Sequence, residues 1–442
     1  TQLMDKRNDY YRNNNPSQPS QSYPQDDRFT SQTRDIAGSR IEMLDAYVHG
    51  SWDVAQMPVT ARVGRQVFNW GEGIFYRGGI NTTNPVDAAK YRLPGAEVKE
   101  VLVPVEALSF NIGLTDSLTL ESFYQTNWKE TRIDPVGTFY SQTDLFADGG
   151  NTGYNDFSGT ALDTPVPGFG NVIGLYSALG NNPLLGPVLQ STGLYANGVT
   201  PAYGNTLKVA SVGKDYNARN DGQFGFAFRY IAEQLNSTEF GLYLVNYHAK
   251  EPTIAADLGG YNGIDMNALT NLLAGVAGSQ AGALADGLAT ADVMGNIQAH
   301  RRYAEDIRMY GFSFNTTLGE ASVFGEVAYR PNLPIGVAAT NDLIGDLANG
   351  AAAAVTGQSI NVGGQMVTLD SQINNAERVE AFNTSLGTIY NFGPTGSFDS
   401  LFGIFELASE HLRGSNLQYT AFDGSNRYYA GTGNYSYVSG GE

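Results

Sequence analysis

Isolated charged residues occupy alternate positions within apolar, strand-like segments of this sequence. Side chains of a strand alternate between two faces, so each charge shares a face with small or polar residues while large apolar side chains share the other. Charges on a common interior face can select a polar solute, or they can pair with one another; we favour pairing, since buried charge has to be neutralised or solvated. These residues are Arg62, Glu121, Arg229, Glu326, Arg330, Glu406 and Glu410.

A second set of candidates lies in long apolar stretches between the strand-like segments. Within residues 265–297 the apolar side chains recur at helical spacing, which predicts a largely helical segment. An apolar stripe has to be covered, either by other connections, which would form a cap, or by a hydrophobic ligand. The sequence leaves both alternatives open. The candidate residues are Leu269, Leu272, Leu273, Val276, Leu284 and Leu288.

Local catalytic signatures are missing from the sequence. It contains no GxSxG motif, no HExxH motif and no cysteine, so the common serine-hydrolase, zinc-protease and thiolate signatures do not occur. The four histidines are scattered. A hydrolase whose serine and histidine come from separate strands would leave no local motif, so a surface lipid hydrolase stays open as an alternative. We expect no enzyme, no metal site and no cofactor.

Five hairpins are expected to position these residues. The stretch "QFGFAFRYIA" at residues 223–232 places an aromatic side chain at every second position, which is typical of a strand with one aromatic face. Similar alternation on both sides of a short turn predicts ten strands in all, and "LQYTAF" and "NRYYAGTGNYSYV" near the end are weaker candidates. The hairpins fall within residues 44–66, 108–128, 223–244, 310–330 and 382–410.

The connections differ sharply in length. Turns within hairpins take a few residues, whereas residues 71–106, 131–220, 250–306 and 331–378 form long connections, which compact soluble domains rarely contain. Short turns at one end and long loops at the other are typical of outer-membrane barrels. The predicted fold class is therefore all-β: a transmembrane antiparallel up-and-down β-barrel of at least ten strands, with long, partly helical extracellular loops.

In such a barrel the phenylalanines of residues 223–232 would face lipid and Arg229 the lumen. The charged residues that become lumen-lining candidates are Arg62, Glu121, Arg229, Glu326, Arg330 and Glu406, and Glu410 would face the same way. The helices predicted within residues 265–297 would lie over or inside the barrel mouth. We expect one barrel domain over residues 1–442, incomplete at one or both ends. Aromatic residues near strand ends would form membrane-interface girdles: Trp52, Trp70, Trp128, Tyr329 and Tyr390.

Composition agrees with this fold class. No run of 18 apolar residues is present, while glycine reaches 53 residues and tyrosine with phenylalanine 48 (26 + 22); the alternating strands of a barrel give weak hydropathy signals. The net charge of −18 argues against nucleic acid as a partner.

The glycine-rich stretch "GRQVFNWGEGIFYRGGINTTNPVD" at residues 64–87 has two interpretations. It lacks the strand–GxGxxG–helix context of a nucleotide site. It could form a bulged strand end and turn with positive φ angles. Alternatively, it could fold inward as a constriction. The sequence does not choose between them.

Residues 61–144 resemble a proteobacterial family known as domain of unknown function (DUF) 1302. The matching elements are "GRQ" at 64–66, "WGE" at 70–72, "GIN" and "NPVD" within 79–87, "PGAEVKE" at 94–100 and "DPVG" at 134–137; Gly73 departs from the serine expected after "WGE". The resemblance implies an outer-membrane barrel, found beside a periplasmic lipid-carrier-like protein and an RND-type inner-membrane exporter. No catalytic residues come with it.

These observations lead to one functional expectation. The protein would lie in the bacterial outer membrane, in contact with its lipids, as a conduit or acceptor for hydrophobic or lipid-like molecules, working with a trans-envelope export system. A general porin for polar solutes and a surface lipid hydrolase are the alternatives. A porin needs a wide, unplugged lumen, and a hydrolase needs a serine and a histidine in contact.

Overall fold

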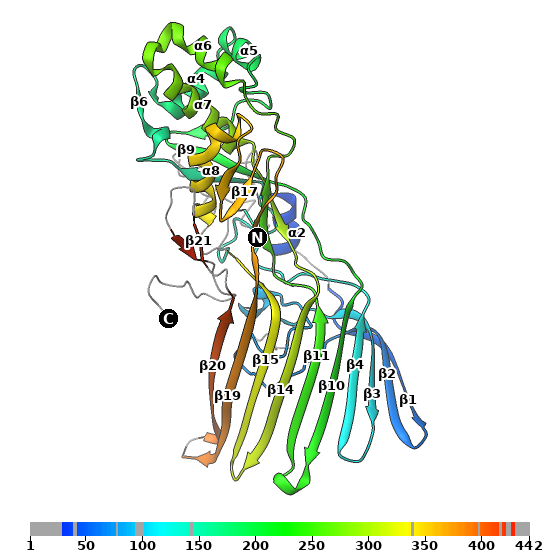
Figure 1. Ribbon diagram of the computed structural model, residues 1–442. Helices are drawn as coiled ribbons and strands as arrows, with labels where there is room; N and C mark the ends of the chain where they lie inside the picture. Colours follow the sequence, from blue (N-terminus) through cyan, green and yellow to red (C-terminus); the bar gives the residue numbers. More distant parts are fainter. Residues whose placement is uncertain are drawn as a thin grey trace.

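A ten-stranded antiparallel sheet dominates the computed structural model, which describes residues 29–38, 42–76, 78–92, 101–141, 145–336, 340–396, 398–414, 418–420 and 426–428 (Figure 1). Neighbours in the sheet follow one another along the chain, in the order β1-β2-β3-β4-β10-β11-β14-β15-β19-β20. The five predicted hairpins are therefore confirmed. The strands are β1 (Ala46–Val54), β2 (Met57–Gln66), β3 (Val105–Gly113), β4 (Leu118–Gln125), β10 (Gln223–Ala232), β11 (Thr238–Tyr247), β14 (Ile307–Leu318), β15 (Ala321–Ile335), β19 (Glu377–Thr395) and β20 (Phe398–Arg413).

The short turns all lie at one end of this sheet and the long connections at the other (Figure 1). The β1–β2 turn is made by Ala55 and Gln56, both with positive φ, as the tightest hairpin turns require. The β10–β11 turn contains the short helix η4 (Glu233–Leu235) and then Asn236 with φ of 53°. The predicted asymmetry of turns and connections is present.

The two faces of the sheet differ in chemistry. Phe226 and Phe228 are each 43% exposed, whereas Ala227 between them is fully buried on the opposite face. We call the face of Phe226 and Phe228 the outer face and the face of Ala227 the inner face. Strand register carries the outer face across the whole sheet. Its exposed apolar side chains include Val63, Phe110, Leu242, Phe312, Leu386, Phe405 and Leu407.

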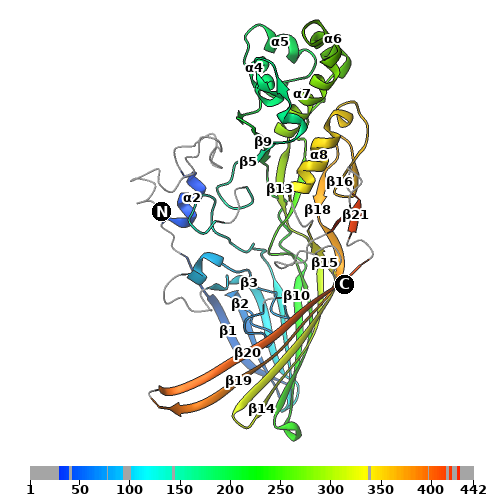
Figure 2. The ribbon, with the colours of Figure 1, turned by 90° about the vertical axis from the view of Figure 1, so that its left-hand side faces the viewer.

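The sheet is strongly curved, and in the described residues its edge strands β1 and β20 do not pair with each other (Figure 2). Eight strand spacings separate β2 from β20, roughly 38 Å in a flat sheet. The chain leaving β2 at Gln66 nevertheless hydrogen-bonds to β20 at Phe75, and nine extended residues reach at most about 32 Å. Because the segment also bends at Gly71, the two edges must curl toward each other.

A second folded body, which we call the cap, stands beyond the end of the sheet that carries the long connections (Figures 1 and 2). Its sheet has the order β18-β12-β13-β9-β5, with β8 on β9, and β13 runs parallel to β9. The strands are β5 (Thr152–Asp156), β8 (Ala202–Tyr203), β9 (Thr206–Val212), β12 (Thr253–Asp257), β13 (Gln298–Arg302) and β18 (Ile373–Asn375). The helices are α4 (Val172–Gly180), α5 (Leu185–Gln190), α6 (Met266–Ala277), α7 (Ala281–Gly295) and α8 (Thr340–Ala354).

Smaller elements complete the described fold. Helix α2 (Ser31–Ala37) and the 3-10 helix η2 (Ala88–Arg92) lie beside the first strands. The 3-10 helices η3 (Ala161–Asp163) and η5 (Gly278–Gln280) belong to the cap. Two small hairpins also belong to the cap: β6 (Pro165–Val166) with β7 (Gly170–Asn171), and β16 (Ile360–Val362) with β17 (Gln365–Val367). Of the candidate strands near the end, the described parts β21 (Gln418–Thr420) and β22 (Asn426–Tyr428) pair with each other in a sheet of their own, and residues 421–425 and 429–438 lie outside the described residues. Among the described residues no helix is long and apolar enough to cross a membrane.

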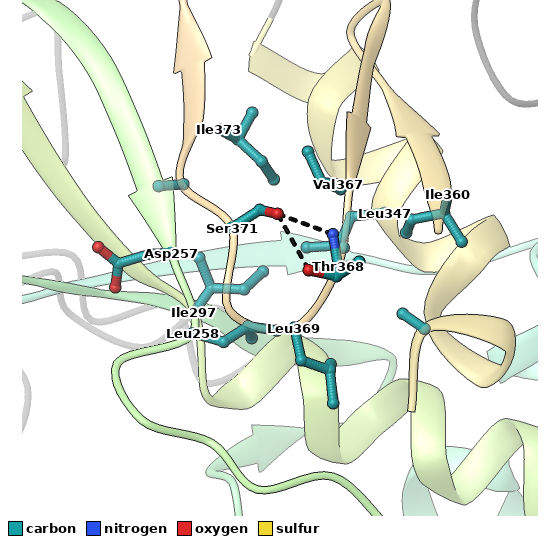
Figure 3. Close-up of a pocket in the computed structure, with 12 residues that line it drawn as sticks. Asp257, Leu258, Ile297, Leu347, Ile360, Val367, Thr368, Leu369, Ser371 and Ile373 are labelled. Atoms are coloured by element: carbon teal, nitrogen blue, oxygen red, sulfur yellow. Dashed lines mark hydrogen bonds between the residues drawn. The ribbon is translucent and has the colours of Figure 1, made fainter. Parts of the chain in front are cut away.

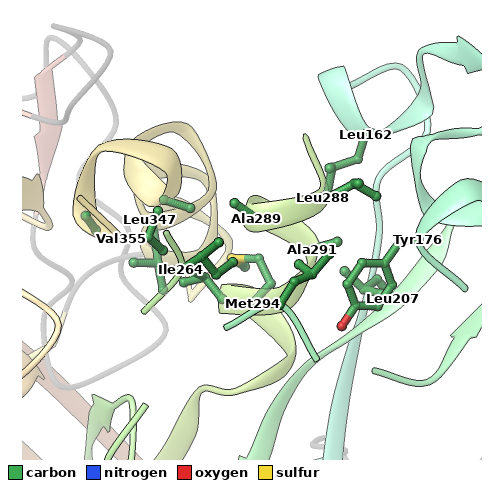
Figure 4. Packing of buried hydrophobic residues seen from close by; sticks show 14 of the residues in the cluster. Leu162, Tyr176, Leu207, Ile264, Leu288, Ala289, Ala291, Met294, Leu347 and Val355 are labelled. Atoms are coloured by element: carbon green, nitrogen blue, oxygen red, sulfur yellow. The ribbon is translucent and has the colours of Figure 1, made fainter. Parts of the chain in front are cut away.

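One hydrophobic core holds the cap together, and three separate connections supply it. Figure 4 shows members of this one cluster: Leu162 and Tyr176 from the β4–β10 connection, Leu288 and Met294 from the β11–β14 connection, and Leu347 from the β15–β19 connection. Residues 265–297 are helical as predicted. They lie at the far end of the cap, beyond its sheet, rather than inside the end of the large sheet (Figure 1).

The predicted apolar stripe of α6 is wrong in part. Leu269 and Leu273 are 0% and 5% exposed, but Leu272 and Val276 are 44% and 87% exposed. The side of α6 that faces the core consists of Met266, Leu269, Leu273 and Ala277, so the buried stripe is narrower than the sequence suggested and leaves out Leu272 and Val276. Leu288 is fully buried and Leu284 partly buried in the same core.

Candidate functional site

The chain between β2 and β3 folds over the inner face of the large sheet; we call residues 67–85 the inward segment. Trp70 begins the crossing, with its ring 5.0 Å from that of Phe123 and 6.0 Å from that of Tyr243. Its indole N–H donates to Glu121 Oε2 at 2.7 Å. The structure therefore selects the inward fold over the bulged strand end.

Glu326 of β15 binds the middle of the inward segment. Its carboxylate accepts backbone N–H groups of Glu72 at 2.6 Å, Gly73 at 3.2 Å and Ile80 at 3.0 Å. The residue is only 4% exposed, so these bonds replace the water that a buried carboxylate would otherwise lack. Bonds to an ionised acceptor are also among the stronger hydrogen bonds in proteins.

Glu406 of β20 binds the tip of the same segment in the same way. Its Oε2 accepts the N–H of Phe75 at 2.6 Å and those of Ile74 and Tyr76 at 3.3 Å each. Two strands near one edge of the sheet thus hold a segment that starts near the other edge.

Arg330 supplies the complementary bonds to the carbonyl groups. Its guanidinium donates to the carbonyl oxygens of Gly78 at 2.9 Å and Gly79 at 2.5 Å. The same group donates to Tyr247 Oη at 2.9 Å and Asn383 Oδ1 at 3.0 Å, which fixes its orientation. Carboxylates bind N–H groups and a guanidinium binds carbonyls, so the backbone of the segment is held by chemistry matched to each group.

Two glycines make this close approach possible. A Cβ on Gly79 would lie 1.6 Å from Glu326 Oε1, and one on Gly71 would lie 2.6 Å from Oε2. Gly71 also has φ of +93°, a conformation that side chains other than glycine rarely adopt. The glycine-rich composition of the stretch therefore has a local steric cause.

The remaining charged candidates lie on the inner face without touching the middle of the inward segment. Arg229 pairs with Glu121 at 3.1 Å and with Glu239 at 2.6 Å. Arg62 is exposed and lies over the Tyr47 ring, 5.3 Å from its centroid. Register places Glu410 opposite Asn383. The candidates are thus of two kinds: Arg229 and Glu121 pair, while Glu326, Arg330 and Glu406 hold backbone.

Sequence reasoning missed several partners in this site. Asn315 donates to Glu72 Oε2 at 3.0 Å, and Asn383 donates to Tyr76 Oη at 2.5 Å. Trp70 was expected in a membrane-interface girdle and is instead buried on the inner face. Trp128 likewise does not point outward: its indole donates to the Ala249 carbonyl and its ring packs on Tyr303. An aromatic near a strand end does not reveal which face it takes.

The buried apolar candidates of the cap, Leu269, Leu273 and Leu288, pack within its hydrophobic core. The apolar cavity in Figure 3 lies between the cap elements and is lined by residues such as Leu258, Leu347 and Ile373. Its volume is about 20 Å³, on the scale of one water molecule. Thr368 and Ser371 close one side through a hydrogen bond of 2.9 Å. Packing therefore accounts for Leu269, Leu273 and Leu288.

The histidines have structural surroundings. His248 Nε2 lies 2.8 Å from the Asp221 carbonyl, and its Nδ1 accepts the Asp306 N–H at 3.1 Å; burial lowers the pKa of this imidazole. His300 Nδ1 bonds to the Lys214 carbonyl at 2.8 Å. Over the described ranges no serine hydroxyl hydrogen-bonds to a histidine ring, and no three His, Cys, Asp or Glu side chains gather as a metal site would need.

Sequence comparison now gives the family. The profile described as "Protein of unknown function (DUF1302)" matches residues 3–439, nearly the whole chain. The chain belongs to the DUF1302 family. No curated protein matches it. In this DUF1302 protein, Trp70, Glu72 and Gly79 of the motifs that carry the resemblance all belong to the inward segment or hold it.

Proposed function

We propose that this DUF1302 protein is a bacterial outer-membrane β-barrel that serves as a conduit or acceptor for hydrophobic or lipid-like molecules. The observation that carries the membrane part is the contrast between the two faces of the large sheet. The outer face exposes apolar side chains from β2 to β20, far beyond the isolated patches of a soluble monomer. The inner face carries the ion pairs and buried polar groups, as the lumen side of a barrel does.

The inward segment argues against a general porin. A porin needs a wide and unobstructed lumen, whereas here backbone from residues 72–80 is bonded to Glu326, Arg330 and Glu406 on the inner face. In a closed barrel the segment would be a constriction, so polar solutes would not pass freely. A lipid hydrolase has less support, because His248 and His300 contact backbone groups and, for His300, the carboxylate of Asp257 rather than a serine.

The hydrophobic cargo is the remaining part of the proposal, and the family resemblance is its main support. Outer-membrane lipids would surround the barrel. A periplasmic lipid-carrier-like protein and an RND-type inner-membrane exporter are the proposed partners on the other side of the envelope. The cap, built from the connections at the opposite end from the short turns, would then be extracellular.

The membrane part is tested by Phe228→Arg. If Phe228 faces lipid, an arginine there costs about 2–4 kcal/mol near the bilayer midplane, and insertion into vesicles of bacterial lipids, followed by heat-modifiable migration on a gel, is impaired. Val276→Arg is the matched control, since Val276 is exposed on α6 in the cap. Equal insertion of both variants would sink the proposal. Transfer of a labelled lipid between vesicles, measured on the inserted wild type, tests the conduit itself.

A further inference from the structure

A cleft of about 590 Å³ lies where the chain enters β1. It is bordered by the end of α2, the residues leading into β1, the helix η2 and residues 132–140. Its volume falls within the range of small-molecule sites, about 300–1,000 Å³. None of the proposed roles of the inward segment involves these residues.

One wall of the cleft is apolar and open to solvent. Ile133, Phe139 and Tyr140 are all exposed, and Phe139 reaches 82%. The rings of Phe139 and Tyr140 lie 4.9 Å apart and nearly perpendicular. Leu44 and Ile36 extend the apolar lining. Exposed aromatic side chains gathered along a cleft mark a binding surface.

The cleft also contains a cluster of charges. Glu42 pairs with Lys90 and with Arg132, each at 2.6 Å. An ammonium has three N–H donors and a guanidinium five, more than the two oxygens of one carboxylate take up. Asp134 is paired with Arg92, and the Arg92 guanidinium also lies over the Tyr140 ring at 4.5 Å. An incoming anion would therefore find donors at Lys90 and Arg132.

We propose that this cleft binds a single-chain anionic amphiphile. Its carboxylate or phosphate head lies at Lys90 and Arg132, and its tail lies along Ile133, Phe139 and Tyr140. The role of the cleft as a receiving site for cargo rests on the proposed function; its ability to bind does not.

The test is fluorescence titration of the full chain, refolded in a nonionic detergent, with 12-(dansylamino)dodecanoic acid, and empty micelles give the background. The methyl ester of the same probe removes the charge and keeps the tail. Lys90→Gln with Arg132→Gln should raise the Kd for the acid about tenfold or more and leave that for the ester unchanged. Phe139→Ser should weaken both probes. Competition by dodecanoate and by dodecyl phosphate separates a carboxylate head from a phosphate head.

Two controls keep the outcome decisive. Lys129 lies in the same β4–β10 connection as Arg132 but pairs with Glu106 outside the cleft. The Lys129→Gln variant should therefore bind both probes normally. Adding Glu42→Gln to the double variant avoids leaving the Glu42 carboxylate without its two cationic partners. Phe139 is exposed, so Phe139→Ser should not disturb folding. Failure of the wild type to bind the acid saturably, or equal acid affinity in the cation variant, overturns the inference. Such a result leaves membrane insertion untouched, whereas failed insertion with intact binding overturns only the proposed function.

Discussion

Glu406 and Phe75 are 331 positions apart in the chain, yet the carboxylate of Glu406 accepts the backbone N–H of Phe75 at 2.6 Å. The contact ties the tip of the inward segment to β20, the last strand of the large sheet. The β2–β3 connection is thus held in part by a residue that is synthesised 331 positions after Phe75. This bond is exposed, whereas those to Glu326 are part-buried or buried, so the two carboxylates should differ in how firmly they hold the segment.

Glu406→Gln should loosen only the tip. The change removes the negative charge, and a bond to a charged group is worth about 1.5–3 kcal/mol against about 0.5–1.5 for a neutral one. Hydrogen exchange measured by mass spectrometry should speed up about tenfold at residues 74–76 and stay unchanged at residues 72 and 73. Glu320→Gln, in an exposed turn at the other end of the sheet, should change neither. Equal exchange at the tip in wild type and variant would show that Glu406 does not hold it.

Gly79→Ala should release the middle of the segment. Its Cβ would fall 1.6 Å from Glu326 Oε1, so the carboxylate would have to leave the N–H groups of Glu72 and Ile80. Those amides should then exchange faster, and the protein should lose about 1–3 kcal/mol of stability. Gly275→Ala is the matched control, since nothing lies within 4 Å of its added Cβ. If both variants exchange like the wild type, the close packing at Gly79 is not a constraint.

Leu273 and Leu272 are neighbours whose substitutions should have opposite outcomes. Leu273→Asp buries a carboxylate in the apolar core of the cap, which is unfavourable by several kcal/mol, and the cap should become sensitive to limited proteolysis. Leu272→Asp places the charge in solvent and should leave the cap resistant. The large sheet should stay folded in both variants. Resistance of the Leu273 variant would contradict the assignment of this residue to the core.

Lys250 should make stability depend on pH. Its Nζ donates to Gln223 Oε1 at 2.6 Å, and burial lowers the pKa of Lys250 to about 7. Between that value and the ordinary lysine pKa of 10.5, the unfolded chain binds a proton that the folded chain does not. Stability should therefore rise with pH from about 7 to about 10.5. Chemical denaturation at pH 7, 8.5 and 10 should show this slope, and Lys250→Met should flatten it; an equally steep slope in the variant would assign the effect to other groups.

The hairpins could be read from the sequence because their signal is local. Alternation such as that around Phe226 and Phe228 needs only the neighbouring residues, and the short turns separate one strand from the next. The cap strands have no such signal: β18 has three residues, and β13 pairs in parallel with β9, about 90 positions earlier. Their partners depend on the fold as a whole.

Only part of the candidate site could be predicted from the sequence, for a related reason. The alternation of side chains along each strand places Glu326, Arg330 and Glu406 on one face. It does not show that these side chains bind the backbone of the β2–β3 connection. Glycine composition fits a bulge as well as an inward fold, and only the 1.6 Å approach at Gly79 explains why glycine is needed. The exposure of Leu272 was missed because helical spacing defines a stripe without fixing its width.

The sheet of the cap has a consequence for the order of biogenesis. Its strand β18 comes from the connection that precedes β19, and it pairs with β12 from an earlier connection. The cap therefore cannot be completed until the chain has been delivered as far as Asn375, by which point eight of the ten strands of the large sheet precede it. Because pairings so distant in sequence form slowly, maturation of the cap should be a late step, and an interrupted or stalled chain would carry apolar connections whose shared core is incomplete.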